Sequence, residues 1–411
     1  MSENIDTPAA APALTGKERL FQKVSTYRVS KDAKEAGIYP FFREIISEMD
    51  TEVVLKGGHR VLMLGSNSYL GLTNHPEVKQ ASQAAVEKYG SGCAGSRFLN
   101  GTLDIHEDLE AELAEFVGKQ AAILFSTGFQ VNLGVISAMT GRHDHVLLDK
   151  LDHASIVDGA RLSSAKVHRF SHNDMADLEK VLKSLPAEDG KLIVVDGVFS
   201  MEGDIARMPE IMDLADRYSA AVMVDDAHAL GVLGRDGRGT ADHFGLTDRM
   251  DFIMATFSKS LASLGGFVAS DQDTIEYIKH HARALIFSAS MPPASAAAAQ
   301  AALRIIKREP ERIERLWRNT KMMREGLQAI GYNTGLSETP VIPVYIGEVM
   351  NLALMNKRLE EEGVFVNPVV PPAVPPTDCL VRISLMATHT RAQIEFGLEK
   401  MEKVGRELGV V

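Results

Sequence analysis

The chain has 411 residues and a formal net charge of −11, with 45% apolar and 24% charged residues. This is an ordinary globular composition, and the length is enough for two domains. The negative charge argues against general nucleic-acid binding and against electrostatic attraction to anionic membranes. Two cysteines, Cys93 and Cys379, cannot form a disulfide framework and suit a reducing compartment, so we expect a cytoplasmic protein.

The amino-terminal part contains no basic-then-apolar signal pattern, and no apolar stretch approaches the roughly 18 residues that a membrane span needs. Residues 17–48 have a weakly amphipathic pattern that predicts a helix. Residues 52–55 and 60–64 are short apolar runs on either side of Gly57-Gly58, which predicts a β-hairpin.

From about residue 65 to 270, short apolar runs alternate with helical patterns. The runs cover residues 121–125, 146–149, 192–196, 221–225, 252–256 and 266–269, with helices expected at 175–185 and 208–218. Each run is nearly continuous and is bounded by Gly, Ser or Asp, which is typical of strands buried on both faces. The fold class is therefore α/β, with a large, mostly parallel sheet.

The pattern changes after residue 290. A long alanine-rich helical region begins at Pro292-Pro293 and is divided at Pro310. Further elements are expected at 341–346 (strand), 352–362 (helix) and 381–385 (strand), with a last helix capped by Thr390 and Gln393. We predict an N-terminal arm and small-domain segment (1–60), a large domain (61–291) and a smaller C-terminal α/β domain (292–411).

Two strand ends carry the chemically most informative residues. Lys259 follows the run 252–256 among small hydroxyl residues, and Asp225 ends the run 221–225 with His228 three residues later. Pyridoxal phosphate requires this pair of groups, a lysine for the Schiff base and a carboxylate for the ring nitrogen. Either residue alone is more often a surface lysine or a turn aspartate, but parallel strands bring their carboxyl ends together.

Other strand ends add polar groups to the same expected edge. Ser126-Thr127-Gly128-Phe129 joins a strand to a helix, an arrangement that binds phosphate, although an ordinary tight turn is an equal alternative. His153 could stack on a flat ring or cap a helix, and Ser200 could contact a ring oxygen. A metal site at Asp225, Asp226 and His228 is the rival interpretation, but it lacks a third ligand with convincing spacing.

These motifs together resemble the α-oxoamine synthases, pyridoxal-phosphate enzymes that condense an amino acid with an acyl-CoA and release CO2. The resemblance runs from about Tyr39 to the C-terminus. It is carried by Asn67-Ser68-Tyr69-Leu70-Gly71, the segment 90–102, Ser126 to Phe129, Asp152 to Ile156, and the segments 196–203, 224–228 and 256–259. The resemblance implies a fold-type-I transferase fold like that of aspartate aminotransferase, and a homodimer with shared active sites.

The resemblance also implies roles for individual residues. Lys259 is similar to the Schiff-base and acid/base lysine, His153 to the residue stacked on the ring, and Asp225 and His228 to the partners of the ring nitrogen and ring oxygen. The expected cofactor contacts are completed by Gly128, Phe129, Ser200, Thr256, Ser258 and, from a neighbouring subunit, Ser288 and Ser290. Arg382 and Ser68 are the expected substrate contacts, with Arg382 on the substrate carboxylate.

Two segments, 89–102 and 255–262, most resemble bacterial members that condense L-serine with palmitoyl-CoA. Ser68 and Val370 depart from some of those members, which carry asparagine and arginine there. Members that use glycine or alanine remain an alternative, as do an aminotransferase and a cofactor-binding relative without catalysis. A lipid product would suit peripheral contact with the inner membrane. The sequence does not fix the acyl-chain length or the acyl carrier.

Overall fold

The computed structural model describes residues 14–411, and its contacts divide the chain after Phe42 into two compact units. The first unit contains α1 (Gly16–Ser25) and α2 (Val29–Glu35). The prediction of one helix over 17–48 was therefore wrong, because no helix covers residues 36–48. Gly37 adopts a φ of +66°, which ends helical geometry, and Pro40 has no N–H to continue it.

The second unit contains all the strands and most of the helices that the structure describes. Its strands are β1 (Glu52–Val54), β2 (Arg60–Met63), β3 (Ala121–Phe125), β4 (His145–Asp149), β5 (Lys166–Phe170), β6 (Lys191–Asp196), β7 (Ala221–Asp225), β8 (Phe252–Thr256), β9 (Gly266–Ser270), β10 (Val341–Gly347), β11 (Val364–Phe365), β12 (Asn367–Val369) and β13 (Cys379–Ser384). Its helices are α3 (Pro76–Tyr89), α4 (Asp104–Val117), α5 (Gly128–Met139), α6 (Ala154–Leu162), α7 (Met175–Lys183), α8 (Met208–Tyr218), the short 3-10 helix η1 (Arg235–Gly237), α9 (Thr240–His243), α10 (Gln272–His281), α11 (Arg283–Ile286), α12 (Pro293–Arg308), α13 (Glu311–Ile330), α14 (Val349–Glu361) and α15 (Arg391–Glu407).

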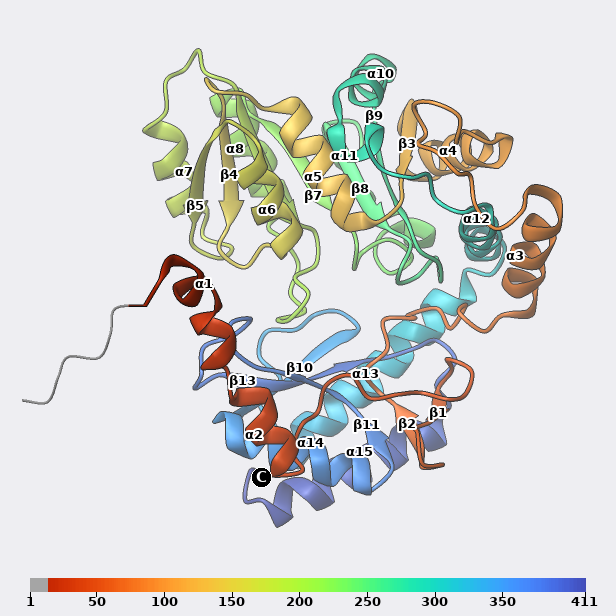
Figure 1. The fold of residues 1–411 in the computed structure, drawn as a ribbon, viewed down its shortest axis with the longest axis vertical. Helices are drawn as coiled ribbons and strands as arrows, with labels where there is room; N and C mark the ends of the chain where they lie inside the picture. Colours follow the sequence, from red (N-terminus) through yellow and green to blue (C-terminus); the bar gives the residue numbers. More distant parts are fainter. Residues whose placement is uncertain (1–13) are drawn as a thin grey trace, which may run out of the picture. The chain divides into compact units, whose positions relative to one another are not determined.

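A seven-stranded sheet in the order β3-β9-β8-β7-β6-β4-β5 forms the centre of this unit (Figure 1). Strands β5, β4, β6, β7 and β8 are parallel, and β9 is antiparallel to both of its neighbours, β3 and β8. Strand β3 therefore runs in the same direction as the parallel strands. This confirms the predicted α/β class with a mostly parallel sheet.

The sheet is buried on both faces because successive strand residues point to opposite sides. In β3, Ala122 and Leu124 belong to one hydrophobic cluster, whereas Ile123 and Phe125 belong to another. The second cluster also contains apolar residues of α5, α6 and α10, and the first contains those of α4, α7, α8 and α12. Helices thus cover both faces, as expected for strands with continuous apolar runs.

All six predicted strands of the large sheet are confirmed, some with one more residue at an end. Strand β5 was missed, because its sequence Lys-Val-His-Arg-Phe lacks the continuous apolar run of its neighbours. It lies at the edge of the sheet, where only Phe170 is fully buried. An edge strand exposes more of its surface and tolerates charged side chains.

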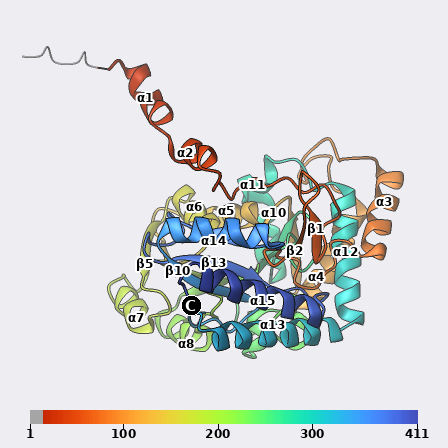
Figure 2. The ribbon, with the colours of Figure 1, turned by 90° about the horizontal axis from the view of Figure 1, so that it is seen from below.

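Two smaller sheets complete the second unit. Strands β10, β13 and β12 form an antiparallel sheet, and β11 pairs in parallel with β2 of the predicted hairpin. Figure 2 shows α14 and α15 running alongside β10 and β13. The last helix begins after a capping box of Thr390 and Gln393, as predicted. The proposed domain boundaries at 60/61 and 291/292 remain predictions.

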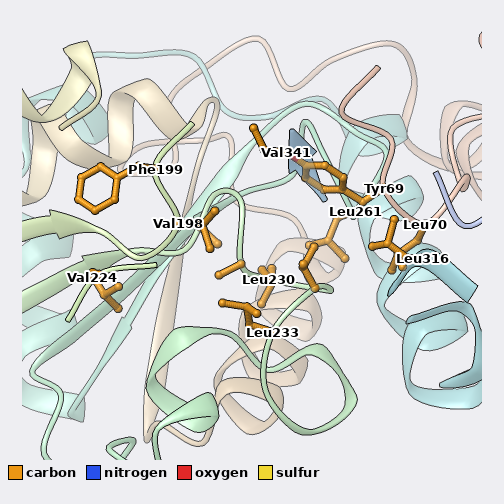
Figure 3. Packing of buried hydrophobic residues seen from close by; sticks show 14 of the residues in the cluster. Tyr69, Leu70, Val198, Phe199, Val224, Leu230, Leu233, Leu261, Leu316 and Val341 are labelled. Atoms are coloured by element: carbon orange, nitrogen blue, oxygen red, sulfur yellow. The ribbon is translucent and has the colours of Figure 1, made fainter. Parts of the chain in front are cut away.

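A dense apolar cluster supports the loops at the carboxyl edge of the large sheet (Figure 3). Tyr69 and Leu70 precede α3, Leu230 follows β7, and Leu261 follows β8, yet all four are almost completely buried in it. Loops fixed by such packing hold their polar residues in place. Among residues 14–411, no helix has the length and apolar character needed to cross a membrane.

Candidate active site

A cavity of about 310 Å³ lies beside the large sheet at the carboxyl ends of its parallel strands, which we call its carboxyl edge. Its volume falls in the range of roughly 300–1,000 Å³ that is usual for small-molecule sites. It is lined by Thr127, Gly128, Phe129, Asn132, His153, Ser155, Asp196, Asp225, Ala227, His228, Met254, Thr256, Ser258, Lys259 and Leu264. Eight of the residues predicted from the sequence are among them: Gly128, Phe129, His153, Asp225, His228, Thr256, Ser258 and Lys259.

The topology of the sheet explains this convergence. The segments after β3, β4, β6, β7 and β8 all leave the same edge, because these strands run in one direction. Asp196 and Asp225 are direct neighbours in the β6–β7 ladder. Open α/β sheets bind ligands at the carboxyl ends of their strands, and this cavity occupies that position.

Lys259 lies on the turn between β8 and β9. The turn is closed by Phe257 N–H, which donates to Gly265 O at 2.9 Å, and by Ser263 N–H, which donates to Phe257 O at 3.0 Å. Burial lowers the pKa of Lys259 to about 8, although the Asp225 and Asp196 carboxylates act in the opposite direction. A buried amine of this kind is uncharged far more often near neutral pH than an ordinary lysine is, and a nucleophile or base requires the uncharged form.

Asp225 is held by two different donors. Its Oδ1 accepts the Ala227 N–H at 2.9 Å, and its Oδ2 accepts the side-chain amide of Asn132 at 2.8 Å. Asp225 is 2% exposed and Asn132 is fully buried. The carboxylate is thus fixed in a dry pocket facing the cavity. The next residue, Asp226, turns away, because its Oδ2 accepts the Thr240 N–H at 2.9 Å.

The amino-terminal end of α5 provides an anion site. Thr127 caps this helix through its hydroxyl, which accepts the Gln130 N–H at 3.1 Å, and Gly128 is the first helical residue. A Cβ at position 128 would lie 2.7 Å from Thr256 Cβ, so glycine permits the close approach of the helix to β8. The hydroxyls of Thr256 and Ser258 lie 3.0 Å apart beside it. Free N–H groups, a helix dipole and hydroxyls together suit a phosphate.

His228 is buried between the β7 turn and the segment before α3. Its Nδ1 is 2.6 Å from the Tyr69 hydroxyl, and both residues are at most 6% exposed. Burial lowers the pKa of His228 well below its usual value, and Lys259, Arg382 and His153 lower it further. His228 is therefore neutral at physiological pH, with its Nδ1 engaged by Tyr69.

Arg382 in β13 reaches the same region from the smaller sheet. Its Nε donates to Ser200 O at 2.5 Å, and its Nη1 donates to Asn67 Oδ1 at 2.9 Å and to Ser384 Oγ at 2.8 Å. Its Nη2 is buried and has no hydrogen-bond partner among residues 14–411. Three contacts thus fix the guanidinium and leave one nitrogen for an anionic group.

The remaining predicted residues do not line the cavity. Ser200 supplies its carbonyl to Arg382, and the Ser68 hydroxyl lies 2.8 Å from that of Thr73. Ser288 accepts the Gln130 side-chain amide at 3.1 Å, whereas Ser290 is 8% exposed. The roles of these four serines remain predictions.

Three polar cavity residues were assigned no individual role from the sequence: Asn132, Ser155 and Asp196. Asn132 follows Gly128 by four positions and so lies on the same face of α5, which is the one signal that sequence spacing offered. Asp196 ends β6 as Asp225 ends β7, and its Oδ2 accepts the His153 N–H at 2.7 Å. Burial and the neighbouring Asp225 raise the pKa of Asp196 well above its usual value.

These features fit pyridoxal phosphate. The close approach at Gly128 and the free end of α5 match its phosphate, Asp225 matches its ring nitrogen, and Lys259 matches its aldehyde. The unpartnered Arg382 nitrogen adds a place for the carboxylate of an amino acid.

Comparison with known proteins agrees with this chemistry. The family model for aminotransferase class I and II matches residues 59–401. Serine palmitoyltransferase from Sphingobacterium spiritivorum is 56% identical over 95% of this chain and 98% of its own length. An 8-amino-7-oxononanoate synthase from Treponema denticola is 44% identical over 93% of this chain and 96% of its own.

A solved structure of a serine palmitoyltransferase with PLP as internal aldimine superimposes with a TM-score of 0.91 at 38% identity, covering 96% of this chain and 99% of the other. The likeness extends over the large sheet and the smaller sheets alike. The chain therefore belongs to the aminotransferase class I and II family, as a pyridoxal-phosphate enzyme of the α-oxoamine synthase type.

Proposed function

We propose that this protein condenses L-serine with palmitoyl-CoA to give 3-ketosphinganine, CoA and CO2, the first step of sphingolipid synthesis. The observation that carries the proposal is the placement of Lys259 in the cavity, with the open Arg382 nitrogen on a guanidinium close enough to act on the pKa of Lys259, in a chain 56% identical to a serine palmitoyltransferase. The lower identity to the 8-amino-7-oxononanoate synthase, 44%, makes that activity the second candidate.

Asp225, Lys259 and Arg382 each have a separate role in this reaction. Bound pyridoxal phosphate supplies the electron sink for negative charge that develops at the amino acid Cα. Asp225, held by Asn132 and Ala227, presents a carboxylate oxygen to the ring nitrogen. Lys259, with its lowered pKa, can accept the Cα proton and return one. Arg382 binds the substrate carboxylate through Nη2.

The test is a visible absorbance titration of the purified protein with L-serine, glycine and L-alanine, each with and without palmitoyl-CoA. We expect a saturable change with serine, and release of CoA only when serine and palmitoyl-CoA are both present. A response confined to glycine or alanine would assign a different α-oxoamine synthase. No visible absorbance from a bound cofactor would contradict the pyridoxal-phosphate assignment.

We also propose a homodimer in which each subunit completes the other's site. Phe129 and Leu264 line the cavity, yet their side chains are 43% and 52% exposed. Phe287, which directly precedes Ser288, is 73% exposed. A second copy would bury these side chains and bring Ser288 and Ser290 toward the neighbouring phosphate. Sedimentation of the holoenzyme should give twice the mass of one chain, and a monomer with full activity would exclude the arrangement.

We propose a cytoplasmic location with peripheral contact at the inner membrane. The two cysteines are free, which suits a reducing compartment. In the first unit, Leu20, Phe21 and Val24 of α1 are all more than half exposed, next to Lys17 and Lys23. Apolar and basic residues together suit an anionic lipid surface. Flotation with phosphatidylglycerol vesicles should carry the protein, and absence from the vesicle fraction would contradict the contact.

A further inference from the structure

A buried hydrogen-bond chain connects Asp225 to His153. The side-chain Nδ2 of Asn132 donates to Asp225 Oδ2 and to Ser155 Oγ, both at 2.8 Å. The Ser155 hydroxyl in turn lies 2.7 Å from His153 Nδ1. Asn132 is 0% and Ser155 1% exposed, so the chain excludes water.

One arrangement of hydrogens uses every donor of this chain. Asp225 Oδ2 accepts from Asn132, so the Asn132 atom facing it is the NH2 group. That group has two hydrogens, and its second contact is Ser155 Oγ. Ser155 Oγ accepts from Asn132, and its single hydrogen finds an acceptor when it is directed to His153 Nδ1, which also accepts the Ser155 N–H. His153 Nδ1 must then carry a lone pair.

The backbone enforces the same state of His153. His153 is the N-cap of α6, and its Nδ1 also accepts the Ser155 N–H at 3.3 Å. A helix amino terminus disfavours a positive charge on its cap. Burial lowers the pKa of His153, with Asp225 opposing and Lys259 reinforcing the effect. The other charged or titratable groups facing it are Asp196, which accepts its backbone N–H, and His228.

We propose that Asn132 and Ser155 form a positioning pair that holds His153 as the neutral tautomer with its proton on Nε2, and that connects this tautomer to the Asp225 carboxylate. Neither residue needs to touch the cofactor, because each acts through a neighbour. The closed Nδ1 leaves Nε2 as the one nitrogen of His153 that can exchange a proton. The proposal rests on His153 belonging to the cofactor site, and it holds whichever amino acid the enzyme accepts.

The direct test is 15N NMR of the holoenzyme labelled in histidine, without substrate, with His153 assigned by the loss of its signals in His153→Asn. In the wild type we expect the Nε2–H tautomer. In Asn132→Asp, two adjacent carboxyl groups share a proton, and the new carboxylate accepts the Ser155 hydroxyl. The hydroxyl hydrogen then leaves His153 Nδ1, and the tautomer should shift toward Nδ1–H.

Ser155→Ala provides a second variant that removes the hydroxyl with little change in volume. It should leave a mixture of tautomers, and the acid limb of the kcat/KM profile should move to higher pH because the neutral imidazole loses a donor. The matched control is Ser137→Ala on α5, the helix that carries Asn132, since the Ser137 hydroxyl donates only to carbonyls of its own helix. This control should match the wild type in both measurements.

Three results would overturn the proposal. They are an Nδ1–H tautomer in the wild type, an unchanged His153 spectrum in both Asn132→Asp and Ser155→Ala, or a Ser137→Ala spectrum altered to the same extent. Thermal melting of each variant identifies a folding defect, in which case the remaining variant decides. The NMR measurement needs no substrate, so failure of the proposed serine specificity would leave its outcome unaffected.

Discussion

The two ends of the parallel strands in the seven-stranded sheet use polar groups differently. At the amino edge, before β3, Lys119 Nζ donates to Thr247 O at 2.7 Å and to Met250 O at 2.5 Å. Before β8, Asp251 Oδ2 accepts the Val222 N–H at 2.7 Å. These two side chains therefore bind backbone groups near the starts of β7 and β8.

At the carboxyl edge, several buried polar atoms have no partner among residues 14–411. They include Asn132 Oδ1 and Arg382 Nη2. An unpartnered buried group costs stability, typically about 1–3 kcal/mol. At the amino ends of its strands the sheet therefore uses polar residues for stability. At the carboxyl ends it keeps unpaired hydrogen-bonding atoms that a ligand can bind. The comparison predicts that substitutions at the two edges separate into effects on chemistry and effects on folding.

Lys259→Ala should produce the largest effect on chemistry. Loss of the reactive amine should lower turnover by more than about 1,000-fold. Borohydride reduction followed by peptide mapping should find the cofactor on the Lys259 peptide of the wild type and on no peptide of the variant. Lys191→Ala, at the amino edge, should retain the labelled peptide. Turnover by Lys259→Ala at the wild-type rate would remove the assignment.

Asp225→Ala should have the next largest effect. Loss of the ring-nitrogen partner should reduce CoA release at saturating substrates by about 100- to 10,000-fold, while the cofactor still binds through its phosphate. The matched control is Asp226→Asn, because the Asp226 carboxylate faces Thr240 instead of the cavity. Equal losses in the two variants would mean that the turn, and not the carboxylate, matters.

Arg382→Lys should act on the amino acid substrate. Lysine cannot reproduce the fork of contacts to Ser200 and Asn67 while offering another N–H, so the KM for the amino acid should rise by about 10- to 100-fold. The KM for the acyl donor should change little. Steady-state kinetics with each substrate varied in turn would show this, and an unchanged amino acid KM would place the carboxylate elsewhere.

The pH dependence of cofactor capture follows from the lowered pKa of Lys259, about 8. Above this pH the amine is neutral in most molecules, and below it the neutral fraction falls by about tenfold per pH unit. The initial rate of pyridoxal phosphate capture by cofactor-free protein, followed by visible absorbance, should therefore rise with pH and level off above about 8. A rise that continues to the ordinary lysine pKa would show that Lys259 is not desolvated.

Lys119→Met should have the smallest effect on chemistry and a measurable one on folding. The variant keeps the apolar stem but loses two hydrogen bonds to backbone carbonyls, so the free energy of unfolding should fall by about 1–3 kcal/mol. Urea denaturation measures this, and kcat per folded molecule should equal that of the wild type. A large loss of kcat would break the distinction between the two edges.

The sequence was sufficient for features that arise from local patterns. Continuous apolar runs identified β3, β4, β6, β7, β8 and β9. The residues at or shortly after the ends of β8, β7 and β3 identified Lys259, Asp225 and Gly128. It was insufficient where the cause is tertiary. Strand β5 is stabilised by pairing with β4 in spite of its charged residues. Asn132 gains its role from a partner, Asp225, that is 93 positions away in sequence.

The turn between β8 and β9, which carries Lys259, has a consequence for the order in which the strands fold. Strands β8 and β9 are consecutive in sequence and pair directly, whereas β3 joins the same sheet across more than half of the large domain's length. Pairings between nearby segments close short loops and form with little entropic penalty. Hydrogen exchange should therefore find the amides of the β8–β9 hairpin protected in cofactor-free protein as early in refolding as any in the sheet. Lys259 would then reach its final geometry before the cavity around it closes.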